Sequence, residues 1–209
     1  MSYPAFYAEV PRIVLHDPLA EFLGAAEDGV IDYGYVDAVR LAGHSCPTVA
    51  AAYGMCLRAL RFLYPDTLPQ RGDIRVEFRA DRLSGVTGVI ASVATLITGA
   101  TRDTGFKGLG GRFDRRKLLY FMADITAESR FTRIDTGAAV DVSTRLQNLP
   151  GDPRVAELLP LCIDGRASTA ETAEFRAAWQ ARVRAVLLEH LDDPEVFELR
   201  PVAREAESA

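Results

Sequence analysis

The chain has 209 residues, of which 48% are hydrophobic, and its formal net charge is −5. A chain of this length and composition can bury a full core, so one main domain is the expected organisation. No apolar stretch approaches the roughly 18 to 20 residues of a membrane span, and residues 1–7 lack the features of a secretory signal. No dense run of Lys and Arg indicates a nucleic-acid binder. We therefore expect neither a membrane nor a nucleic acid as a partner.

The three cysteines, Cys46, Cys56 and Cys162, stand at unrelated spacings. An odd number of cysteines without a regular framework argues against disulfides and suits a reducing compartment. The sequence therefore predicts three free thiols and a cytoplasmic location. Cys56 falls in the apolar stripe of a predicted helix and is expected to be buried.

The N-terminal part is predicted to be mostly helical. Asp17 can cap a helix over residues 18–26, and a second helical or extended segment covers residues 33–41. The clearest helix covers residues 47–63, where apolar side chains recur at spacings of three and four. Pro47 suits the first turn of that helix.

The middle of the chain carries strand and loop signals. Residues 74–78 alternate apolar and charged side chains, as a half-buried strand does. The apolar run 89–97 fits a helix or a buried strand, and periodicity does not decide between them. Residues 98–112 contain five glycines and are expected to be a loop, followed by strands over residues 117–123 and 138–145.

The C-terminal part reads as helices followed by a possible edge strand. A short helix is expected over residues 153–162, and Ser168 with Glu171 forms a capping box that starts a long helix to about His190. Residues 195–202 could add the edge strand.

These elements predict an α+β fold in which a mixed or antiparallel sheet packs with helices. The expected organisation is an α+β core over residues 1–150, a helical C-terminal extension over residues 151–202 and a disordered tail over residues 203–209.

The segment Gly-His-Ser-Cys-Pro at residues 43–47 is the strongest candidate for a functional site. His44 and Cys46 stand two apart in a turn, and imidazole nitrogen and thiolate sulfur are favoured zinc ligands. The helix that follows directs its free N–H groups and positive end at the cysteine, which favours the thiolate. Cys46 is therefore expected to be the most reactive thiol. The alternative is an ordinary helix entry, with both side chains packed against the core.

Four further residues are candidates for the same site. His16 precedes a helix start and can converge on the same pocket, although an exposed neighbour of a helix cap is the simpler interpretation. The glycine-rich segment 104–111 lacks the ending of a phosphate-binding loop and is expected to be a hairpin or a lid. Lys107, Arg112 and Asp103 are candidates for contacts with an anion or a carboxylate.

Two motifs connect the chain to a known family. Gly-His-Ser-Cys-Pro at 43–47 and Ile-Thr-Gly-Ala-Thr at 97–101 resemble the Gly-His-X-Cys-Pro-Gly and Thr-Gly-Cys-Thr motifs of the formylmethanofuran dehydrogenase E-subunit family, and the similarity extends over residues 16–121. The resemblance implies an α+β core and an intertwined homodimer. In some members it also implies a metal site that includes the motif's His and Cys.

The resemblance implies His44 and Cys46 as metal ligands. Ala100 stands where the family has its second cysteine, so the matched residues offer no further ligand. His16, a carboxylate such as Asp81 or Asp103, or water is left to complete the shell.

Three functional hypotheses follow. The first is a metal-dependent enzyme for a small polar or anionic substrate, in which His44 and Cys46 hold zinc or another divalent transition metal with an open position. Lys107 is then a catalytic candidate, and it or Arg112 orients the substrate. The alternative is a non-catalytic accessory protein that binds a metal, a cofactor or a sulfur species through Cys46. A third is a metal-free Cys46 nucleophile with His44 as its base.

Overall fold

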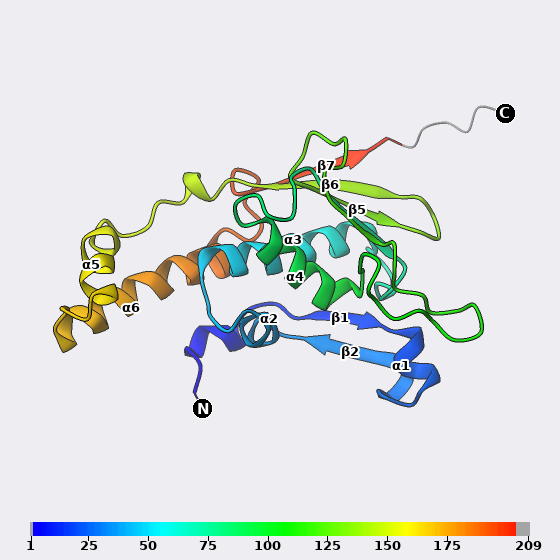
Figure 1. Ribbon diagram of the computed structural model, residues 1–209, viewed down its shortest axis with the longest axis horizontal. Helices are drawn as coiled ribbons and strands as arrows, with labels where there is room; N and C mark the ends of the chain where they lie inside the picture. Colours follow the sequence, from blue (N-terminus) through cyan, green and yellow to red (C-terminus); the bar gives the residue numbers. More distant parts are fainter. Residues whose placement is uncertain (1, 204–209) are drawn as a thin grey trace.

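The structure, a computed structural model, describes residues 2–203 and has three layers (Figure 1). A five-stranded sheet forms one outer layer, α-helices form the middle layer, and a two-stranded sheet with short helices beside it forms the other outer layer. One sheet is mixed and the other antiparallel, so the fold is α+β, as predicted. Apart from Ala203, the predicted disordered tail lies outside the described residues. Within the described part, no helix is long and apolar enough to cross a membrane.

The small sheet consists of β1 (Ile13–His16) and β2 (Val30–Tyr33), which pair antiparallel. Both strands were missed in the sequence, because four residues are too few for a clear alternating pattern. Between them lies α1 (Pro18–Phe22), capped by Asp17 as predicted. This helix is shorter than expected because the chain turns at Gly24, whose φ is +66°. Two short 3-10 turns complete the N-terminal part, η1 (Ala5–Ala8) and η2 (Glu27–Gly29).

The middle layer consists of α3 (Pro47–Leu63) and α4 (Thr87–Thr98). The bounds of α3 are those predicted, and the undecided apolar run over residues 89–97 is helical. α3 is buried on nearly every side, as expected of a helix between two sheets. At Gly54 a Cβ atom would lie 2.6 Å from the ring of Phe197, so this glycine allows the sheet to pack closely on the helix.

The five-stranded sheet has the order β4-β3-β5-β6-β7. β4 pairs parallel with β3, and the other pairs are antiparallel. The strands are β3 (Ile74–Phe78), β4 (Leu119–Tyr120), β5 (Ser129–Arg133), β6 (Ala139–Thr144) and β7 (Phe197–Val202).

Two strand predictions have different outcomes, and one strand was missed. β7 lies at the sheet edge, as the sequence suggested. β4 is much shorter than the predicted strand over residues 117–123, because Lys117 and Met122 have positive φ angles and interrupt the extended chain. β5 was missed, because its five residues include only one large apolar side chain, Phe131.

The last helices form a hairpin that projects from the three layers (Figure 1). It consists of α5 (Arg154–Ile163) and α6 (Thr169–Arg184), and we call residues 154–184 the arm. The predicted capping box of Ser168 and Glu171 starts α6. The chain does not continue as α-helix to His190 but passes into a π-helical segment, Ala185–Glu189, which carries Val186 and Leu187 into the core.

α2 (Tyr35–Ala42) joins the small sheet to the Gly-His-Ser-Cys-Pro segment at residues 43–47. The 3-10 turn η3 (Leu146–Asn148) precedes the arm.

Candidate functional site

The Gly43–Pro47 turn connects α2 to α3. Gly43 ends α2 with a φ of +74°, a left-handed conformation that suits glycine. Cys46 is the N-cap of α3, and its Sγ accepts a hydrogen bond from the N–H of Val49 at 3.5 Å. Pro47 occupies the first helical turn, as predicted. The helix start thus holds the Cys46 sulfur at the positive end of a buried helix.

Helix α6 holds this turn in place from one side. The indole N–H of Trp179 donates to the carbonyl oxygen of Ser45 at 2.9 Å. The Ser45 hydroxyl lies 2.9 Å from the hydroxyl of Tyr35 and donates to Gln180 Oε1 at 3.3 Å. The Tyr7 hydroxyl donates to the same Gln180 oxygen at 3.1 Å. Burial raises the pKa of Tyr35, so its hydroxyl stays protonated beside Ser45.

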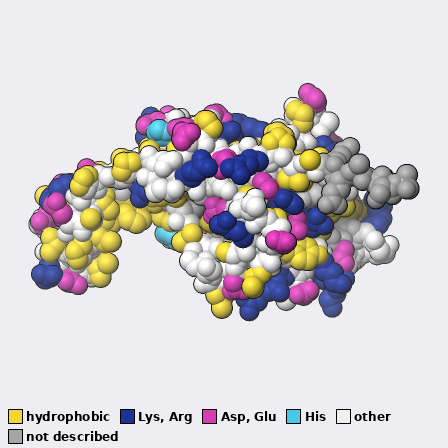
Figure 2. All heavy atoms as spheres, turned by 90° about the horizontal axis from the view of Figure 1, so that it is seen from above, with side chains coloured by type: hydrophobic (Ala, Val, Ile, Leu, Met, Phe, Trp, Pro, Cys, Tyr) yellow, Lys and Arg dark blue, Asp and Glu magenta, His cyan; other side chains and the backbone are white. Residues whose placement is uncertain are grey.

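A cavity of about 750 Å³ lies between the turn and the arm. His44 and Cys46 line it from the turn, and Trp179 and Arg182 line it from α6. Figure 2 shows the concave surface where the arm meets the rest of the molecule. The remaining walls are mainly apolar and consist of Pro47, Thr48, Leu146, Gly151, Asp152, Pro153, Val155, Ala156, Leu159 and Ala178.

His44 presents one ring nitrogen for binding. Its Nδ1 lies 3.0 Å from the carbonyl oxygen of Ala42. A carbonyl oxygen only accepts, so Nδ1 carries the proton in this contact and neutral His44 keeps its lone pair on Nε2. Metal-binding histidines are commonly oriented by this kind of backbone contact.

Charged groups are few at this cavity. Arg182 is the single cation among the described lining residues, and its guanidinium donates to the carbonyl oxygens of Leu146 and Leu149. Asp152 is the single carboxylate of that lining, and its Oδ1 accepts the N–H of Arg154. An apolar cavity lined by one arginine and one aspartate suits a small ligand that has an apolar body and a polar or charged group.

The donors at the cavity fit a metal only in part. Imidazole nitrogen and thiolate sulfur suit zinc, but catalytic zinc sites have three protein ligands. Among residues 2–203, no cluster of three or more His, Cys, Asp or Glu side chains is arranged to hold a metal. One chain, as far as it is described, therefore offers His44 and Cys46 and lacks a third ligand.

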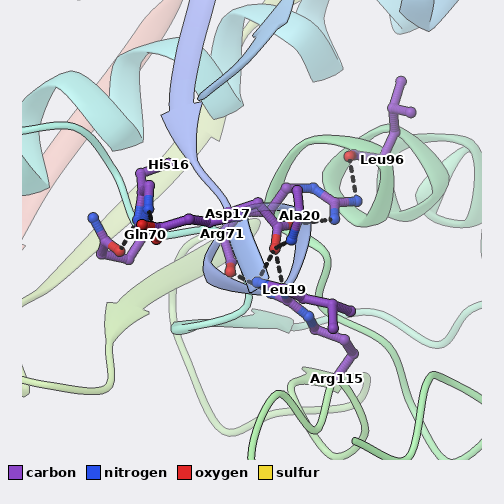
Figure 3. A network of polar contacts seen from close by, with 9 residues as sticks. His16, Asp17, Leu19, Ala20, Gln70, Arg71, Leu96 and Arg115 are labelled. Carbon is purple, nitrogen blue, oxygen red and sulfur yellow. Dashed lines mark hydrogen bonds and ion pairs between the residues drawn. The ribbon is translucent and has the colours of Figure 1, made fainter. Parts of the chain in front are cut away.

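The other predicted site residues lie away from this cavity. His16 Nδ1 lies 2.7 Å from Gln70 Oε1 (Figure 3). Its Nε2 lies 2.8 Å from a Glu21 carboxylate oxygen. The hydrogen bond with Gln70, and secondarily the one with Glu21, raises the pKa of His16. Its expected convergence on Cys46 is not found, because β1 directs it to the segment after α3.

The glycine-rich loop also lies apart from the cavity. Lys107, Arg112 and Asp103 do not line it. Asp103 and Asp81 line a different hollow, and Arg112 lines another. Of the predicted site residues, the cavity therefore brings together His44 and Cys46. Trp179, Arg182 and Asp152 line the cavity but were missed as site residues in the sequence.

His16 adjoins a buried polar cluster centred on Asp17 (Figure 3). Asp17 is only 3% exposed and accepts hydrogen bonds from Arg71 at 2.9 Å and Arg115 at 2.6 Å. The backbone N–H groups of Leu19 and Ala20 donate to the same carboxylate. Burial alone would raise the pKa of Asp17, but the two arginines and the backbone donors outweigh burial and lower it. The second family-like motif, residues 97–101, lies beside this cluster, because Gly99 at the end of α4 is next to Arg71 and Arg115. The first motif, residues 43–47, lies at the other end of the middle layer.

The chain matches no model of a known protein family, and a search of curated proteins finds no match. The resemblance to the formylmethanofuran dehydrogenase E-subunit family therefore depends on the motif residues alone.

Proposed function

We propose that this protein is a metal-dependent enzyme that acts on a small anionic substrate with an apolar body in the cavity beside Cys46. The protein ligands of its zinc-like ion are His44 Nε2 and Cys46 Sγ. The proposal rests mainly on the Nδ1–H contact of His44 with Ala42, which leaves the Nε2 lone pair free on a cavity that the Cys46 sulfur also lines. A bound ion of this kind polarises a substrate or activates water.

The residues of the cavity have distinct roles in this proposal. Arg182, held by two backbone carbonyls, attracts the anionic group of the substrate. The walls around Arg182 are mainly apolar, which lowers the local dielectric and strengthens that attraction. Trp179 forms a rigid wall, since its indole is fixed to the Ser45 carbonyl. Arg182 thus takes the orienting role that the sequence suggested for Lys107 or Arg112.

A homodimer would complete this site. The arm exposes large apolar side chains, with Ile163 at 74% and Leu159 at 37% exposure. Figure 2 shows hydrophobic side chains gathered along the arm. Apolar surface of this kind usually marks a protein–protein interface. We infer that the arm packs against a second copy of the chain, which closes the cavity and supplies the third metal ligand.

Zinc titration of metal-free protein, with a chromophoric chelator as competitor, tests the proposal. The wild type should bind about one zinc ion per chain, as expected for one three-ligand site. Cys46→Ser and His44→Gln should lose this binding, while the controls Cys162→Ser and His16→Gln should keep it. Zinc binding that is the same in Cys46→Ser and wild type would reject the metal site. Sedimentation velocity of wild type and Ile163→Asp separately tests the dimer.

A non-catalytic accessory protein is the second candidate. The observation that favours it is that no third donor joins His44 and Cys46 in a metal-binding cluster among the described residues. In this case Cys46 alone holds a cofactor or a sulfur species. Alkylation by iodoacetamide separates the two functions. The enzyme hypothesis predicts that zinc protects Cys46 from alkylation and that the protection disappears in His44→Gln. An accessory protein that holds a cofactor or a sulfur species through Cys46 alone predicts no protection by zinc.

A further inference from the structure

A second hollow, of about 510 Å³, lies beside β4 and shares no lining residue with the Cys46 cavity. Three cations line it, and each comes from a different segment. Arg82 precedes α4, Arg102 follows it, and Lys117 precedes β4. Most arginines of the described chain form ion pairs, but these three cations have no such partner within residues 2–203. Their charges are therefore available to an external anion.

The backbone around this hollow is strained. Four non-glycine residues in the described chain have positive φ, and two of them, Lys117 at +58° and Met122 at +57°, line the hollow. The N–H of Lys117 donates to the Arg102 carbonyl at 2.6 Å, and its own carbonyl accepts the Tyr120 hydroxyl at 2.7 Å. Strained residues that the surrounding contacts hold in place are concentrated at ligand sites. The fold thus holds the backbone of Lys117 fixed beside Arg102.

An apolar groove of about 460 Å³ lies next to the hollow, along α4. The two adjoin, because Arg82, Leu119 and Phe121 line both of them. Leu83 and Leu41 line the groove and are exposed, Leu83 at 83%. Apolar side chains grouped along a groove are typical of a ligand-binding site.

We propose that the hollow and the groove together bind an anionic amphiphile. A carboxylate or phosphate head lies among Arg82, Arg102 and Lys117, and an apolar chain lies along α4. Arg102 already lies over the Phe121 ring, with its guanidinium carbon 5.9 Å from the ring centroid. The order of the two compartments, charged and then apolar, matches the two parts of such a molecule.

Two carboxylates in the same lining limit the affinity for an anion. Asp81 accepts the N–H of Leu83 at 2.9 Å, so it has a structural role in the turn before α4. Asp103 is exposed and has no ion-pair partner among the described residues. Three cations still exceed two carboxylates, so the lining favours an anion. This arrangement also tests whether the ligand is an anion, because removing the negative charge of Asp103 should then strengthen its binding.

Isothermal titration of the full chain with monomeric decyl phosphate tests the proposal. Decyl phosphate should bind at least about tenfold more tightly than inorganic phosphate, because the groove buries the alkyl chain. Decyltrimethylammonium, which has the opposite charge, should not bind. Arg102→Gln should weaken decyl phosphate several-fold, Asp103→Asn should strengthen it, and Arg112→Gln, a cation outside the hollow, should change nothing. Lys117→Asn repeats the head-group test with a residue that tolerates the left-handed backbone.

Ser92→Phe tests the groove separately, because Ser92 is exposed on α4 and lines it. This variant should reduce the affinity for decyl phosphate to that for inorganic phosphate, and unfolding curves should match the wild type. Equal binding of the two oppositely charged amphiphiles, or no effect of Arg102→Gln and Ser92→Phe, overturns the proposal. Flotation with phosphatidylglycerol vesicles shows whether the amphiphile comes from a membrane or from solution. If the wild type floats with the vesicles and Arg102→Gln does not, the ligand is a membrane lipid. If decyl phosphate binds and the protein does not float, the ligand is an amphiphile in solution.

Discussion

The polar groups at the two ends of the middle layer differ in their surroundings: one set is buried and the other lies on a cavity. At one end, the buried Asp17 carboxylate receives two arginines and two backbone N–H groups. At the other, His44 and Cys46 are each fixed by one backbone contact and lie on an open cavity. A buried carboxylate whose two oxygens are both hydrogen-bonded holds a fold together, whereas oriented groups that face an open cavity are available to a ligand. The first end should therefore control stability and the second should control binding.

The largest effect is expected from Asp17→Asn. Asparagine keeps the cap of α1, but it leaves Arg71 and Arg115 without their counter-charge in a buried place. We expect the free energy of unfolding to fall by about 3–5 kcal/mol, the cost of breaking a buried pair. Urea denaturation measures this change. Asp32→Asn is the matched control, because its pair with Arg12 is exposed and should contribute no more than about 1 kcal/mol. Equal losses in the two variants would remove the stabilising role assigned to Asp17.

The pH dependence of stability should show the same contrast. The pKa of Asp17 is lower in the folded protein than in the unfolded chain. Its contribution is therefore complete above the unfolded pKa and is lost as pH falls through the folded value. The free energy of unfolding of the wild type should decrease as pH is lowered below about 4, and the decrease should be shallower in Asp17→Asn. Parallel curves for the two proteins would show that other carboxylates dominate the acid response.

The sequence predicted one of these ends much better than the other. The Cys46 turn was found because its signals are local: a glycine before it, a proline after it and apolar spacing along α3. The Asp17 cluster depends on Arg71 and Arg115, which are distant in sequence and meet Asp17 only in the folded chain. For the same reason Trp179 and Arg182 were missed at the cavity. They reach it because the arm folds back toward the turn, a tertiary contact that no spacing in the sequence reveals.

A smaller effect is expected from Trp179→Phe. The ring volume is largely kept, but the hydrogen bond from the indole to the Ser45 carbonyl is lost. The free energy of unfolding should fall by about 1 kcal/mol, the usual net value of one hydrogen bond. The turn should also loosen, so iodoacetamide should alkylate Cys46 faster than in the wild type. Phe175→Leu is the control, since the Phe175 ring packs against Trp179 at a centroid distance of 5.7 Å but makes no hydrogen bond to Ser45. An unchanged alkylation rate would show that α6 does not position the turn.

The last prediction concerns the three thiols, which should differ sharply in their reactivity toward iodoacetamide. All three cysteines are free; Cys46 and Cys162 are partly exposed, whereas Cys56 is buried in α3. Burial raises the pKa of Cys56 to about 12, so little thiolate forms and reagents cannot reach it. Mass spectrometry after iodoacetamide treatment should find Cys46 and Cys162 modified and Cys56 intact. In Asp17→Asn, Cys56 should become modified as the unfolded population rises, while Cys46 should react at its native rate. Modification of Cys56 in the folded wild type would contradict this, because it would mean that α3 opens locally and that its two ends are not independent.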